Sequence, residues 1–248
     1  MSIKTNLTNT SFLIIHNWLH KASANGLDWL DCKIEEISKT ANKRTLFTSY
    51  SAVPRYLGKH KLNLNLSGKD LQAARLVKGW NPADLTTDRA GRILLLLSFP
   101  SEDRDRYVAT LEQIIAAADV EEAIAFYRSL PLLPHPEKFK LRAAEGIRTN
   151  MTSVFNAVAL NNPYPAQYLD ELAWNQMVLK ALFVGSPLHP IYGLKSRNNQ
   201  QLSQMLIDYA RERLAANRTV SPELWELAMP FQPEVVAELK SIYKLHYN

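Results

Sequence analysis

Apolar residues recur along this chain mainly at the three- and four-residue spacing that places them on one face of a helix. Two N-terminal runs are the clearest examples, and their members are Phe12, Ile15, Trp18 and Leu19, and then Trp29, Leu30, Ile34 and Ile37. Strand-like alternation is confined to residues 61–66, which we interpret as an extended linker because no second run pairs with it. The pattern predicts an all-α fold with no significant β-sheet, in which roughly ten to twelve short helices stack like an irregular α-solenoid.

Capping and stop signals give the expected ends of several helices. Residues 71–77 predict a helix that ends at Gly79, and Asn81-Pro82 predicts the start of the next helix, which runs to Phe99. Three prolines within residues 131–136 mark the best candidate for an internal boundary. We expect a single all-helical domain over residues 1–248, with a subdivision near 131–136 as the alternative.

The helix expected at residues 170–184 has apolar residues on all sides, which predicts that it is largely buried. Its polar residues Asn175, Gln176 and Lys180 then need partners, because an unpaired buried amide costs about 1–3 kcal/mol. Gln176 and Lys180 are four residues apart and share a helix face. The polar residues that we expect to converge with this helix are Arg148, Asn150, His189 and Arg197.

These candidate residues support two interpretations, and the sequence leaves both open. In one, they line a ligand pocket, where Arg148, Lys180 and Arg197 would suit an anionic ligand. In the other, they form a satisfied polar network that fixes the register of packed helices.

The composition mainly excludes certain kinds of site. Hydrophobic residues make up 46% and charged residues 21% of the 248 residues, which is typical of a globular chain. The single cysteine, Cys32, excludes an internal disulfide and a zinc site built from several thiolates. His16 and His20 have the spacing that can bring two imidazoles to one metal ion, but the sequence offers no evident third ligand. We therefore predict no metal site and no cofactor.

The charge is uneven along the chain, which has a net charge of +5. Residues 33–92 contain twelve basic and five acidic residues, and a nucleic-acid or anionic-membrane surface would give such a bias. No aromatic residues alternate with the basic ones as in a single-strand binder, so we expect no nucleic-acid partner. The sequence has no secretory signal and no apolar stretch of about 20 residues, so we expect a cytoplasmic protein without a transmembrane segment.

The C-terminal half resembles the EboA family. Its most specific stretches are NPYP at residues 162–165 and WNQMVLKALF at residues 174–183, and the resemblance covers residues 137–231 well. Shorter matching segments are Ile147-Arg148-Thr149-Asn150, Gly193-Leu194, Arg197-Asn198, Asp208-Tyr209-Ala210 and Pro222-Glu223-Leu224-Trp225. The family pattern carries His and Trp where this chain has Arg211 and Leu214, so nothing is carried over to those two positions.

The resemblance implies a function in metabolite traffic. Proteins of this family are encoded in the ebo operon, which is associated with moving a secondary-metabolite precursor and also encodes a membrane prenyltransferase. We therefore expect a non-catalytic helical binding or scaffold protein, whose partners are a small metabolite or other ebo proteins. The alternative is an enzyme of unfamiliar type that acts on a small anionic metabolite in a pocket near Lys180, His189 and Arg197. The resemblance supplies no catalytic residues.

Overall fold

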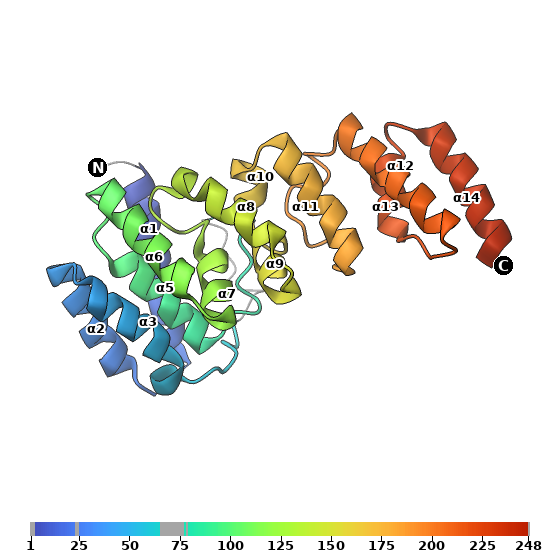
Figure 1. Ribbon diagram of the computed structural model, residues 1–248. Helices are drawn as coiled ribbons and strands as arrows, with labels where there is room; N and C mark the ends of the chain where they lie inside the picture. Colours follow the sequence, from blue (N-terminus) through green and yellow to red (C-terminus); the bar gives the residue numbers. More distant parts are fainter. Residues whose placement is uncertain (1–2, 23–24, 65–76, 78, 248) are drawn as a thin grey trace. The chain divides into compact units, whose positions relative to one another are not determined.

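The computed structural model describes the chain except for residues 1–2, 23–24, 65–76, 78 and 248 (Figure 1). Within the described residues the protein has thirteen α-helices and no strand or sheet, and 69% of it is helical. A single bridge between Lys61 and Thr86 is the only β-type pairing in that part of the chain. The predicted all-α fold is therefore confirmed.

The chain divides into two compact units, Met1–Tyr164 and Pro165–Asn248. The residues near 131–136, where a subdivision was the alternative, lie inside the first unit. The helices of this unit are α1 (Ile3–Lys21), α2 (Leu27–Thr40), α3 (Lys43–Leu57), α5 (Thr87–Ser98), α6 (Arg104–Ala117), α7 (Val120–Ser129), the 3₁₀-helix η1 (Pro136–Phe139), α8 (Lys140–Arg148) and α9 (Thr152–Ala159). Helix α10 (Tyr164–Tyr168) follows, and the second unit continues with α11 (Glu171–Val184), α12 (Gln200–Ala215), α13 (Pro222–Ala228) and α14 (Pro233–Tyr247).

Helix α5 forms the centre of the first unit, where it packs against α1, α2, α3 and α7 (Figure 1). Its side chains from Thr87 to Leu96 are buried except for Arg89. Gly91 allows the close approach of α3, because a Cβ there would lie 2.4 Å from Leu57 Cδ1 and 2.9 Å from Val53 Cγ1. The run of apolar residues in α5 is thus explained by neighbours on every side.

The predicted start of this helix at Pro82 is wrong. Asn81 does accept a hydrogen bond from the Ala83 N–H at 3.0 Å, but the chain then makes a turn instead of a helix. The Leu85 carbonyl accepts from Leu62 N–H and the Thr87 N–H donates to the His60 carbonyl, so residues 85–87 pair with the 60–62 segment. Helix α5 begins at Thr87, the last residue of this pairing. The helix predicted at residues 71–77 lies almost wholly outside the described residues.

In the second unit, α12 packs against α11, α13 and α14. The Asp170 carboxylate accepts from the Ala173 N–H at 2.8 Å and caps the start of α11, and Gly185, at φ +76°, ends it. Burial along α11 differs from the sequence prediction, however. Only one stripe is buried, whereas Phe183 is 76% exposed and Leu172 is 55% exposed. The prediction that this helix is largely buried was therefore wrong.

Candidate functional site

The exposed side of α11 faces a groove of about 710 Å³ that lies entirely within the second unit. We call it the α11–α12 groove. Its lining residues are Gln176, Leu179, Lys180 and Phe183 of α11, Tyr209, Glu212 and Arg213 of α12, and Arg218 in the following loop. A neighbouring cavity of about 830 Å³ also borders Tyr209 and Arg213 and extends to Trp225 and Lys240. Two sequence-predicted residues, Gln176 and Lys180, therefore lie in a groove.

The groove combines positive charge with apolar surface. Lys180, Arg213 and Arg218 bring three cations, against the single carboxylate of Glu212. Arg213 is held in place because its Nε donates to the Thr219 carbonyl at 3.0 Å and its guanidinium lies 6.0 Å from the centre of the Tyr209 ring. Lys180 is half-buried, and this partial desolvation lowers the pKa of its ammonium group below its ordinary value. Such a cation gains more from an anionic partner than a fully hydrated one does.

Arg197 supports the backbone of the second unit. Its Nη1 donates to the carbonyl groups of Pro165, Ala166 and Leu169 at 3.1, 3.4 and 2.9 Å, and its guanidinium lies 4.8 Å from the Trp174 ring centre. The Ala166 carbonyl lies in the last turn of α10 and Leu169 follows that helix, where a helix leaves acceptors without intrahelical partners, whereas the Pro165 carbonyl also accepts from the Leu169 N–H at 3.1 Å. Arg197 therefore caps a short helix and stacks on the first buried aromatic residue of α11.

Asn175 is also part of the packing between helices. It is completely buried, and its amide exchanges hydrogen bonds of 3.2 and 2.9 Å with the amide of Asn199. The Asn199 side chain also accepts from the Leu202 N–H at 2.8 Å and so caps the start of α12. This pair fixes α11 against the first turn of α12.

The remaining candidates lie elsewhere. His189 is exposed, and its backbone N–H donates to Glu223 at 2.7 Å while its Nδ1 lies 3.5 Å from the same carboxylate. Arg148 and Asn150 are exposed residues of the first unit. Neither His189 nor Arg197 is among the residues that line the groove beside Lys180.

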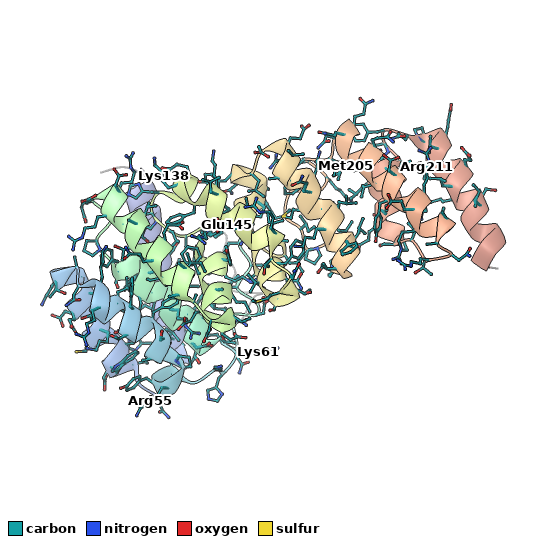
Figure 2. All side chains as sticks on the ribbon, viewed as in Figure 1. Arg55, Lys61, Lys138, Glu145, Met205 and Arg211 are labelled. Carbon is teal, nitrogen blue, oxygen red and sulfur yellow. The ribbon has the colours of Figure 1, made fainter. Side chains whose placement is uncertain are left out.

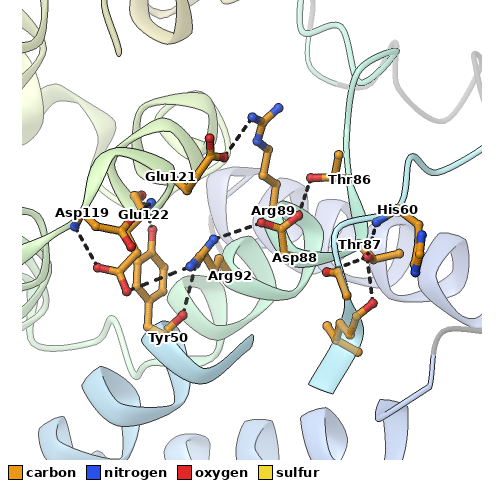
Figure 3. Close-up of polar contacts among 12 residues, drawn as sticks. Tyr50, His60, Thr86, Thr87, Asp88, Arg89, Arg92, Asp119, Glu121 and Glu122 are labelled. Carbon is orange, nitrogen blue, oxygen red and sulfur yellow. Dashed lines mark hydrogen bonds and ion pairs between the residues drawn. The ribbon is translucent and has the colours of Figure 1, made fainter. Parts of the chain in front are cut away.

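The first unit contains a buried charged network that the sequence analysis missed (Figure 3). Arg92, whose side chain is 2% exposed, donates to Asp88 at 3.1 Å and to the Tyr50 carbonyl at 3.1 Å, and lies 4.0 Å from Glu122. The Tyr50 hydroxyl donates to the Glu122 carbonyl at 2.8 Å, and burial raises the pKa of Tyr50. These groups satisfy one another, so the network joins α3, α5 and α7. The spacing of Asp88 and Arg92, four residues apart directly before the apolar run at residues 93–97, was the available signal.

The groove residues that the sequence analysis missed are Leu179, Phe183, Tyr209, Glu212, Arg213 and Arg218. Several lie inside the segments that resemble the EboA family, but their spacing alone does not show that α11 and α12 share a groove. Arg211, labelled in Figure 2, lies on α12 but outside the groove lining and contacts Asp208 at 3.4 Å. It provides a matched control for the groove arginines.

None of the helices in the described part of the chain is long and apolar enough to cross a membrane. No curated protein and no solved structure matches the chain. The family described as "Metabolite traffic protein EboA" matches residues 11–229, a range that includes both helices of the groove. Because this match covers most of the 248 residues, the chain belongs to the EboA family of metabolite traffic proteins.

Proposed function

We propose that this protein is a non-catalytic binding protein that holds a small, amphipathic, anionic secondary-metabolite precursor in the α11–α12 groove. The observation that carries the proposal is the combination of three cations with the exposed ring of Phe183 on one concave surface. Exposed aromatic surface next to fixed positive charge favours a ligand with an apolar body and an acidic group. In this proposal the protein acts in the cytoplasm and passes its ligand to other ebo products, including the membrane prenyltransferase.

Two arginines of the groove are held to different extents, and this suits reversible binding. Arg213 is fixed by the Thr219 carbonyl and the Tyr209 ring, so it is oriented before a ligand arrives. Arg218 also lines the groove but is exposed, so it remains hydrated until a ligand contacts it. We expect Phe183 and Leu179 to contact the apolar part of the ligand.

Native mass spectrometry of the protein, purified at low salt from its own organism, tests the proposal. We expect a small mass excess that disappears on denaturation, and chemical analysis of the released compound should show an acidic group on an apolar body. A protein-sized excess would identify a partner and would support the scaffold part of the proposal. A bare chain mass would contradict a stably carried ligand, and conversion of the released compound on return to the protein would favour an enzyme.

A defined probe tests the groove itself. 8-Anilinonaphthalene-1-sulfonate is anionic and aromatic, and its fluorescence rises in an apolar site. We expect Phe183→Ser and Arg218→Gln each to weaken its binding roughly fivefold, because each removes one contact worth about 1 kcal/mol. Arg211→Gln is the matched control and should leave the affinity unchanged. If all three variants bind the probe with equal affinity and have unchanged circular dichroism, the probe does not bind in the groove.

A further inference from the structure

His16 and His20, one turn apart on α1, both point at the carboxylate of Asp31 on α2. His16 Nε2 lies 2.7 Å from Asp31 Oδ1, and His20 Nε2 lies 3.8 Å from Asp31 Oδ2. One ligand atom from each residue falls within 4.8 Å of the other two. Among the described residues, this is the only group of three or more histidine, cysteine or acidic side chains that could hold a metal ion.

We propose that His16, His20 and Asp31 bind a divalent first-row transition-metal ion, with Zn²⁺ as the best fit, and that this ion joins α1 to α2. Two imidazoles and one carboxylate are a ligand set that zinc accepts, with a water molecule in the fourth position. The proposed site lies in the first unit and is independent of the α11–α12 groove. The sequence analysis predicted no metal site because it found no third ligand, and the structure places Asp31 in that position.

The geometry requires only side-chain adjustments. Ligand atoms around a tetrahedral zinc ion lie about 3.3 Å apart, given bonds of about 2.0–2.1 Å. The 2.7 Å distance between His16 and Asp31 must open slightly, and the zinc ion replaces the proton that this pair shares. The His20 side chain is 50% exposed and has room to rotate towards the other two ligands. The 42% exposure of Asp31 leaves the site accessible to an ion from solvent.

Neighbouring packing holds the first ligand in place. The Phe12 ring stacks on the His16 imidazole, with ring centres 5.9 Å apart and an angle of 12° between the planes. The His16 and His20 rings have centres 4.6 Å apart. His16 is thus oriented by an aromatic neighbour on one side and by Asp31 on the other, and pre-orientation of a ligand favours metal binding.

An ion at this position would link two helices that both pack on α5. Because metal binding stabilises the folded state that contains the site, zinc should raise the melting temperature of the first unit. At a zinc concentration about 100 times the dissociation constant, we expect a rise of roughly 5 °C. The pair of His189 and Glu223 is the natural control, since no further histidine, cysteine or acidic side chain of the described chain completes it to a group of three.

The test is isothermal titration calorimetry of the full chain with ZnCl₂ after treatment with EDTA. We expect one equivalent of zinc, and we expect His20→Gln and Asp31→Asn each to weaken binding at least about tenfold, as loss of a metal ligand should. His189→Gln should bind zinc like the unmodified chain. Co²⁺ in place of Zn²⁺ should give the visible absorption of a tetrahedral nitrogen–oxygen site, and His20→Gln should abolish it.

Two results would overturn the proposal. One is the absence of measurable heat and of a shift in melting temperature with zinc. The other is zinc binding that His20→Gln and Asp31→Asn leave unchanged, because the ion would then sit elsewhere. His20 is half exposed, so His20→Gln should fold even if Asp31→Asn does not, and circular dichroism checks this.

Discussion

Helices α5 and α11 are both apolar in sequence, yet they are used in opposite ways. In α5 every residue from Thr87 to Leu96 except Arg89 is buried, and the charges of Asp88 and Arg92 are enclosed and paired. In α11 one stripe is buried, while Gln176, Lys180 and Phe183 face the groove. Paired polar groups on a helix that is covered on all sides indicate that they stabilise the packing of the helices around it. Unpacked apolar residues beside cations indicate a surface that another molecule can cover.

Arg92→Met tests how much the buried ion pair of α5 stabilises the first unit, and it should have the largest effect on the free energy of unfolding. It leaves the buried Asp88 carboxylate without its cationic partner, although the Thr86 hydroxyl still donates to it, and breaking a buried ion pair in this way costs about 3–5 kcal/mol. Urea denaturation measures the free energy of unfolding. The double variant Asp88→Asn/Arg92→Met should be destabilised less than Arg92→Met alone. If both variants lose the same free energy of unfolding, the uncompensated Asp88 charge is not the cause of the loss.

Truncating one apolar residue in each helix compares the two directly. Leu95→Ala removes a completely buried side chain and should cost about 2–5 kcal/mol. Phe183→Ala removes a side chain that is 76% exposed, so the free energy of unfolding should change by less than about 0.5 kcal/mol. The same urea titrations measure both. A loss at Phe183 as large as that at Leu95 would mean that this ring is part of the packed core.

Arg197→Lys tests whether the stability of the second unit also depends on a charged side chain. Lysine keeps the charge, but its side chain is shorter and lacks the planar guanidinium that lies over the Trp174 ring, so we expect a loss of about 1.5–3 kcal/mol. Thermal unfolding followed by tryptophan fluorescence measures it. Lys195→Ala, an exposed neighbour, is the control. An unchanged melting temperature would show that the hydrogen bonds of Arg197 contribute little.

A further prediction concerns the pH dependence of stability. Burial raises the pKa of Tyr127 to about 12, whereas an unfolded tyrosine has a pKa of about 10. Between these values the unfolded chain binds fewer protons than the folded one, so stability falls as pH rises and the loss is about 1.4 kcal/mol at pH 11. Tyr127→Phe should therefore lose less stability between pH 9 and pH 11 than the unmodified chain. Parallel pH profiles would contradict this.

Sequence signals located the features that depend on neighbouring residues. Asp170 caps α11 and Gly185 ends it where the pattern predicts, and the helical period predicts the all-α fold. Features that need a distant partner were not predictable in this way. The start of α5 depends on pairing with residues 60–62, and the exposure of Phe183 depends on what packs against α11.

The same limit applies to the candidate residues. Gln176 and Lys180 share a groove, as their spacing suggested, but Arg197 contacts carbonyl groups 28–32 residues away. Asp31 meets His16 and His20 because α1 and α2 both pack on α5. Residue types indicated which groups carry charge, whereas tertiary contacts decide which of them face solvent, backbone or one another.

The hydrogen bonds of Tyr50 have a consequence for how the first unit opens. Its carbonyl accepts from Arg92 on α5, and its hydroxyl donates to the Glu122 carbonyl on α7. Moving any one of α3, α5 and α7 away therefore leaves an arginine or a carbonyl group without a partner in a dry interior. Partial opening is costly, so these three helices should open together as one cooperative unit. Their amide protons should be among the last in the chain to exchange with solvent deuterium.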